Sequence, residues 1–140
     1  MHHDEITFKN ELWTQDLKAK KEFSLNWVLG RNKNGLGLDC VHFGGNSGYQ
    51  AINLAYLMGA KRIILLGFDC KPVDGKDHWF GQHPNGLVQI QPYQLWMNHF
   101  PSLAQDLKNR NIEVINCSPD SAIQCFKKMS IDDVLLHEQY

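Results

Sequence analysis

The chain has 140 residues, of which 43% are hydrophobic and 21% charged, a composition ordinary for one globular domain that can bury its own core. The formal net charge of −1 provides no basic excess for nucleic acid. No apolar run approaches the roughly 20 residues that a membrane-spanning helix needs, and the N-terminus lacks the apolar stretch of a signal peptide. We therefore expect a cytoplasmic protein without nucleic-acid or membrane partners, whose four cysteines are free thiols.

The first part of the chain, residues 1–38, is polar with scattered aromatic residues, and we expect it to pack on a domain formed by residues 39–140. Residues 12–13 and 25–28 could be short strands, with a polar helical turn or a loop at 14–22 between them. Residues 30–37 are rich in Gly and Asn, which predicts a loop.

A sharper pattern follows from residue 39 to residue 69. Residues 40–43 form a short β run, 44–48 a glycine-rich turn, and 49–58 a helix with an apolar face that Gly59 should end. The continuous apolar run that follows, residues 62–69, is typical of a parallel strand covered on both faces.

The remaining pattern alternates helices with a strand. A long polar and aromatic loop covers 70–92, and a helix is predicted over 92–109, where Pro101 should kink or split it. A strand is predicted at 112–117, a short helix at 118–126 and a last helical piece at 131–137. Alternating strands and helices imply parallel crossovers, so we expect an α/β fold, specifically a Rossmann-like three-layer domain with a mostly parallel sheet.

The glycine-rich turn is the first candidate for a ligand site. Glycine allows close backbone approach, and Ser47 or Asn46 can cap the helix that follows. The free backbone N–H groups at the helix N-terminus point outward, and those donors suit a phosphate or carboxylate. The turn matches neither a dinucleotide fingerprint nor a Walker loop, so a tight structural turn is the alternative. The candidate ligand-binding residues are Gly44, Gly45, Asn46, Ser47 and Gly48.

The end of the most apolar strand and the loop after it provide a second set of candidates. In open α/β sheets ligands bind beyond the carboxyl ends of strands, where Asp69 lies, so it could contact a sugar or base, bind a metal, or cap the structure. His78 is a candidate general acid or base, and Trp79 and His83 are candidate substrate contacts. Asp69 and Asp77 could instead hold a divalent metal.

The end of the third predicted strand carries the last two candidates. Asn116 and Ser118 lie at the same expected edge of the sheet as Asp69. They could hydrogen-bond a ligand, and a cap on the end of the strand is equally plausible.

Two stretches of the chain carry a family resemblance, residues 44–52 and 57–69. They resemble the MptE-like group, which includes archaeal 6-hydroxymethylpterin diphosphokinases, and are more distantly similar to bacterial sialyltransferases that use a CMP-sugar. Residues 78–84 and 115–118 resemble the phage and prophage branch of this superfamily. The resemblance implies a nucleotide or nucleotide-sugar ligand, a transferase of glycosyl or diphosphate type, His78 and Asp69 as catalytic residues, and Mg²⁺ bound with the nucleotide.

One departure from the family concerns the N-terminus. Full-length relatives begin with an extra strand and a Gly-Pro-Ser-type loop that this sequence lacks before Met1, so we expect a truncated or minimal form of the domain. An exposed sheet edge should result, which a homodimer or a partner chain could cover. The alternatives to a transferase are a degenerate, non-catalytic binding module and a phage accessory or assembly protein.

Overall fold

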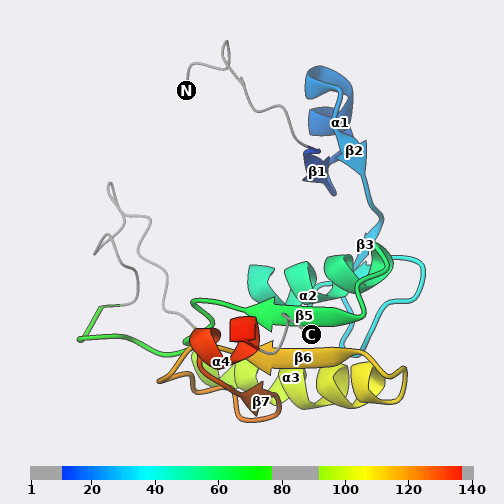
Figure 1. Cartoon of the computed structure of the whole chain (residues 1–140). Helices are drawn as coiled ribbons and strands as arrows, with labels where there is room; N and C mark the ends of the chain where they lie inside the picture. Colours follow the sequence, from blue (N-terminus) through cyan, green and yellow to red (C-terminus); the bar gives the residue numbers. More distant parts are fainter. Residues whose placement is uncertain (1–10, 77–91, 137–140) are drawn as a thin grey trace.

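The computed structural model describes residues 11–76 and 92–136 and shows a mixed α/β fold (Figure 1). The strands are β1 (Trp13–Thr14), β2 (Asn26–Trp27), β3 (Gly30–Arg31), β4 (Val41–His42), β5 (Arg62–Leu65), β6 (Glu113–Asn116) and β7 (Lys127–Lys128). The helices are α1 (Leu17–Phe23), α2 (Ser47–Leu57), α3 (Tyr93–Lys108) and α4 (Ile131–Leu136). None of these helices is both long and apolar enough to cross a membrane.

All pairs between these strands are parallel, as the alternation of strands and helices predicted. The largest sheet has the order β5-β6-β7, and its register aligns Ile64 with Ile115. Two further pairs, β1-β2 and β3-β4, form separate small sheets. Within the described residues, β5 therefore lies at one edge of its sheet, and the exposed edge expected from the sequence is present.

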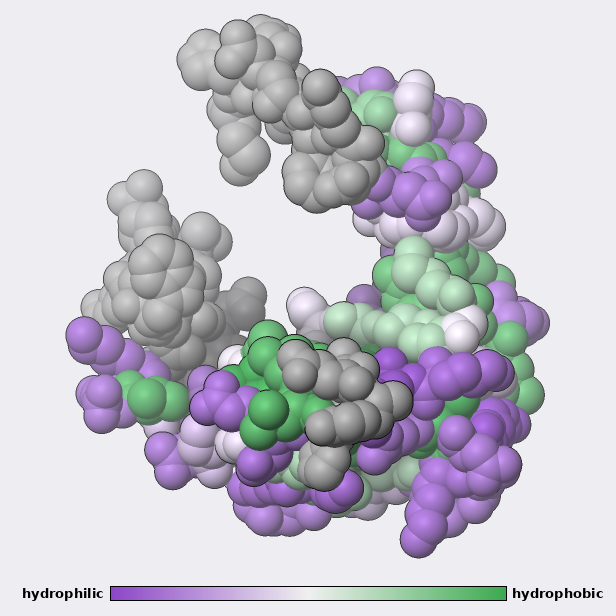
Figure 2. All heavy atoms as spheres, in the orientation of Figure 1, coloured by the Kyte–Doolittle hydropathy of each residue, from purple (hydrophilic) through white to green (hydrophobic). Residues whose placement is uncertain are grey.

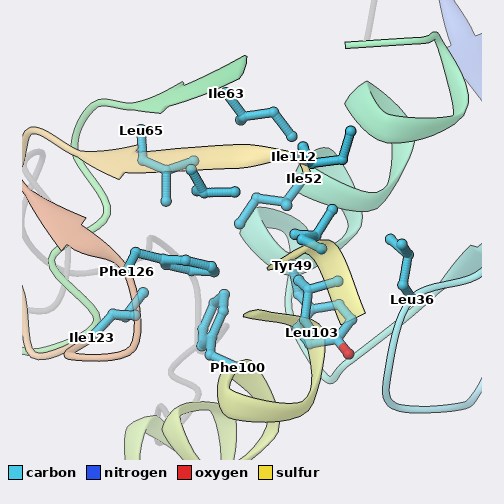
Figure 3. Packing of buried hydrophobic residues seen from close by; sticks show 12 residues of the cluster. Leu36, Tyr49, Ile52, Ile63, Leu65, Phe100, Leu103, Ile112, Ile123 and Phe126 are labelled. Carbon is cyan, nitrogen blue, oxygen red and sulfur yellow. The ribbon is translucent and has the colours of Figure 1, made fainter. Parts of the chain in front are cut away.

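Helices cover both faces of the β5-β6-β7 sheet. On one face, α2 and α3 bury Tyr49 and Phe100 against β5 and β6, in the main core cluster (Figure 3). On the other face, Val134 of α4 packs with Ile115 of β6. This two-sided covering explains the continuous apolar run in β5, because a strand between two layers needs apolar side chains on both faces.

The boundaries of α2 follow from its two ends. The Asn46 side chain accepts a hydrogen bond from the Tyr49 N–H at 2.9 Å, which caps the helix one turn before its first buried residue. Gly59 follows the helix with a φ of 91°, a left-handed conformation that glycine adopts without a steric penalty. The predicted helix over 49–58 is thus confirmed, with a start two residues earlier.

The predicted helix at 118–126 is wrong. This segment is irregular, and it leads into β7, which the sequence pattern did not predict. The reason lies at Ser121. Its hydroxyl accepts from the Asn116 side chain and the Ile123 N–H and donates to the Phe68 carbonyl, and these hydrogen bonds compete with a helical conformation. The sequence also predicted that Pro101 would kink or split the helix at 92–109. Pro101 lies inside α3, which is not split there.

The N-terminal elements β1, α1 and β2 form an arm (residues 11–29) that stands apart from the three-stranded sheet (Figure 1). The two short strands expected here are confirmed, and the Asp16 side chain caps α1 by accepting from the Lys18 and Ala19 N–H groups. Hydrophilic residues cover most of the visible surface of α1 (Figure 2). The main body begins with β3, because Leu36 is already part of the core.

The loop between β3 and β4 is fastened to α2 by a buried amide. The Asn53 side chain is fully buried, and it accepts from the Gly37 and His42 N–H groups and donates to the Gly37 carbonyl, each at 2.9 Å. These bonds satisfy the polar groups of Asn53 inside the core. Asn53 therefore holds the loop and is not a ligand contact.

Candidate functional site

A cavity of about 320 Å³ opens where the N-terminus of α2, the segment after β5 and the first turns of α3 meet. Small-molecule pockets usually span roughly 300–1,000 Å³, so the space suits one small ligand or a part of a larger one. Its lining comprises Asn46, Ser47, Gly48, Gly67, Phe68, Asp69, Cys70, Tyr93, Trp96, Phe100 and Ile123. The cavity thus brings together the predicted glycine turn and the predicted strand end at Asp69.

The first turn of α2 presents backbone donors to this cavity. Asn46 uses its side chain on the Tyr49 N–H, and its carbonyl accepts from Gln50. The N–H groups of Ser47 and Gly48 have no acceptor within the described part of the chain. Two free amides at the positive end of an 11-residue helix favour an anionic group.

Aromatic rings occupy the space beside each glycine of the turn. A Cβ on Gly44 would overlap the Tyr49 ring, one on Gly45 would lie 3.0 Å from Trp96 Cδ1, and one on Gly48 would lie 2.8 Å from Phe68 Cε1. Gly44 and Gly45 also have φ values of 51° and 83°. Close packing of rings therefore accounts for these glycines, and of the three only Gly48 lines the cavity.

His99 fixes the turn from the side of α3. Its Nδ1 lies 2.8 Å from the Gly44 carbonyl oxygen, which can only accept, so Nδ1 carries the proton. In the neutral ring, Nε2 then carries no proton and can accept a hydrogen bond. The residue lies 55 positions after the turn that it contacts, so no local spacing in the sequence indicates this pair.

The aromatic wall of the cavity was also missed from the sequence. Tyr93 and Trp96 lie one turn apart at the start of α3, and their rings meet edge to face with centroids 5.5 Å apart. The i, i+3 spacing was visible, but it was interpreted as part of the apolar core face of the helix. Phe68 closes the wall from the segment after β5.

Asp69 and Cys70 lie in the segment after β5, which ends at Leu65, four residues before the strand end predicted at Asp69. Asp69 is half-buried, and its carboxylate has no hydrogen-bond or ionic partner within residues 11–76 and 92–136. Cys70 takes a left-handed φ of 52°, which is uncommon outside glycine and turns the chain away from the strand. Burial raises the pKa of the Cys70 thiol above its ordinary value, so the thiol stays neutral near pH 7 and is not an activated nucleophile.

Asn116 and Ser118 lie beneath the cavity and do not line it. Both are buried, with 1% and 3% of their surface exposed. Ser118 Oγ accepts from the Phe68 N–H at 2.7 Å, while Asn116 accepts from the Ser118 N–H and donates to Ser121 Oγ. Their polar groups are therefore used to join the ends of β5 and β6, which favours the strand-cap alternative.

Four predicted site residues lie outside the described residues: Asp77, His78, Trp79 and His83. Within the described ranges, no group of three or more His, Cys, Asp or Glu side chains could hold a metal ion. Asp69 is thus the single predicted metal ligand that the structure places in the cavity. Comparisons with models of protein families, with curated proteins and with solved structures gave no match.

Proposed function

We propose that the cavity at the N-terminus of α2 binds a nucleotide or nucleotide-sugar, and that the protein is a nucleotide-dependent transferase of glycosyl or diphosphate type. One observation carries the proposal: free helix N-terminal amides and an aromatic wall line the same cavity. A phosphate needs the first, because peptide N–H groups and the helix dipole favour an anion. A planar base needs the second, because it can stack on a ring face.

Each part of the cavity then has a role. The Ser47 and Gly48 N–H groups would bind a phosphate, and Phe68 or Trp96 would stack the base. The Asp69 carboxylate, which has no partner within residues 11–76 and 92–136, would accept from a ribose hydroxyl or hold Mg²⁺ that accompanies the nucleotide. The acid or base of the transfer would be His78, in the segment that follows.

The proposal includes a Rossmann-like three-layer topology of the MptE-like, phage-type branch. Supporting this topology, β5 and β6 are parallel, helices cover both faces of their sheet, and the cavity lies beyond the carboxyl end of β5. Ligands bind at this end of the strands in open α/β sheets.

Calorimetry with CMP, CTP, ATP and GMP, each with and without Mg²⁺, tests the proposal. We expect binding of at least one nucleotide, weakened about tenfold by Asp69→Asn, because hydrogen bonds to a charged group are the stronger ones. Asp120→Asn makes the same chemical change at an exposed carboxylate outside the cavity lining, and this matched control should bind as the wild type does. Failure of all four nucleotides to bind to folded protein would remove the proposal.

A second candidate function is a binding module without catalysis. It is favoured by the described lining of the cavity, in which Asp69 is the only carboxylate and no histidine is present. The variant His78→Ala separates the two functions. A transferase would lose turnover and keep nucleotide affinity, whereas a module would show no turnover in the wild type.

We also propose that the free edge of β5 pairs with the same edge of a second copy, giving a homodimer in the cytoplasm. The edge is bordered by exposed apolar residues, with Leu66 61% exposed and a hydrophobic patch over α4, where Leu135 and Leu136 are exposed (Figure 2). Solution mass by light scattering tests this pairing. A strict monomer at high concentration would exclude it.

A further inference from the structure

A second cavity, of about 500 Å³, lies between the N-terminal arm and α2. Trp13 and Gln15 line it from the arm, and Gln50 and Leu54 line it from α2. It meets the first cavity at the N-terminus of α2, because Ser47 lines both. A ligand or ligand pair could therefore occupy the two cavities on either side of this helix end.

The amide groups in this cavity are arranged for hydroxyl recognition. Gln15 Nε2 donates to Gln50 Oε1 at 3.0 Å, which joins the arm to α2 and sets the orientation of both side chains. The Gln50 Nε2 group has no acceptor within the described residues and remains a donor. The Asp16 side chain, next to Gln15, uses one carboxylate oxygen to cap α1 and leaves the other as an acceptor.

The rest of the lining is uncharged and mostly apolar, with the hydroxyl groups of Thr14 and Ser47 as further polar groups. Val28, Val41 and Leu54 form apolar walls, and the Trp13 indole is 40% exposed at the arm side. None of the described lining residues is cationic, and Asp16 is the one charged residue among them. A phosphate or carboxylate thus meets no cationic side chain among these residues, whereas a neutral ring with an apolar face and polar edges finds both apolar walls and hydrogen-bonding groups.

We propose that this second cavity binds a neutral sugar ring, with its C–H face on Trp13 and its hydroxyl groups on Gln50 and Asp16. The inference rests on the proposed function in one respect, the position of the sugar beside the nucleotide at Ser47. The sugar is either the transferred unit of a nucleotide-sugar or a separate acceptor. Both kinds of sugar present an apolar ring face and hydroxyl groups, so both would need the Trp13 ring and the polar groups of Gln50 and Asp16.

Saturation-transfer NMR on the whole chain tests the assignment with glucose, galactose and N-acetylglucosamine as probes. We expect a signal from at least one sugar, reduced roughly fivefold by Trp13→Ala and largely retained by Trp13→Phe, because an aromatic face contributes modestly. Gln50→Ala should reduce the signal independently of the indole. Gln105→Ala, on the exposed surface of α3 and outside the lining of both cavities, is the matched control for Gln50→Ala.

One further set of measurements distinguishes a free acceptor sugar from a transferred sugar. It also distinguishes failure of the sugar proposal from failure of the nucleotide proposal. A free acceptor gives sugar signals without nucleotide, whereas a transferred unit gives signals only from UDP-galactose or UDP-N-acetylglucosamine. Absence of every signal in folded wild type, or signals unchanged in both Trp13→Ala and Gln50→Ala, would overturn the inference. Nucleotide calorimetry on Trp13→Ala should match the wild type. A wild type that binds a nucleotide but gives no sugar signal would overturn this inference alone.

Discussion

His99 donates its Nδ1–H to the Gly44 carbonyl oxygen at 2.8 Å and so joins the middle of α3 to the turn that opens α2. The bond matters because the turn carries the free amides of the candidate site. It also connects the aromatic wall to the helix N-terminus, since Trp96 lies one turn before His99 and contacts Gly45.

Removing this bond should loosen the turn. We expect His99→Ala to lower the free energy of unfolding by about 1 kcal/mol, the usual net contribution of one hydrogen bond, and to weaken any nucleotide binding. His99→Asn is the matched control, because its amide can donate to the same carbonyl. Urea unfolding and calorimetry measure the two effects. Equal loss in both variants would show that the bond is not the cause.

Gly44→Ala should be much more damaging than Gly59→Ala. Both glycines have positive φ, 51° and 91°, so both substitutions carry the left-handed penalty of about 1–2 kcal/mol. A Cβ on Gly44 would also overlap the Tyr49 ring, whereas one on Gly59 meets nothing within 4 Å. We expect thermal unfolding to show an additional loss of roughly 1–3 kcal/mol for Gly44→Ala. Equal losses would contradict the ring packing.

Asn53→Ala should destabilise the fold through the loop that it holds. The substitution leaves the Gly37 and His42 N–H groups without their acceptor, and an unsatisfied buried group costs about 1–3 kcal/mol. Asn98→Ala is the control, because Asn98 accepts from Gln94 on the exposed surface of α3. Chemical denaturation should show little change in the control. A similar small change in Asn53→Ala would exclude this role.

Alkylation of Cys70 should be slow at neutral pH and should accelerate as the pH rises. Burial raises the pKa of its thiol, so the folded protein holds the proton at pH values where an unfolded thiol has lost it. For the same reason, the contribution of this group to stability falls as the pH rises above the unfolded pKa. Iodoacetamide labelling with peptide mapping measures the rate, with urea-unfolded protein as the control.

A bound nucleotide should protect Cys70, because the residue lines the candidate cavity. Labelling as fast as in the unfolded chain at neutral pH would contradict the burial of this thiol. Unchanged labelling in the presence of saturating nucleotide would place the nucleotide elsewhere.

The local sequence pattern predicted those helices and strands whose start and stop residues lie within a few positions of one another. The apolar run of β5, the Asn46 cap and Gly59 predicted a parallel strand and the helix before it, and the structure has both. Local pattern failed at residues 118–126, where turn-forming residues suggested a helix start. There Ser121 bonds to Phe68 and Asn116, which the sequence does not place beside it.

The candidate site shows the same division. The sequence alone indicated that a glycine turn and Asp69 would both lie beyond the carboxyl ends of parallel strands, on one side of a sheet, although β5 ends at Leu65 and not at Asp69 as predicted. Only the tertiary structure decided that rings fill the space beside the glycines, that His99 holds Gly44, and that Asn116 and Ser118 are buried. The contacts of His99 with Gly44 and of Ser118 with Phe68 join residues that are 55 and 50 apart in the chain, and no local spacing encodes them.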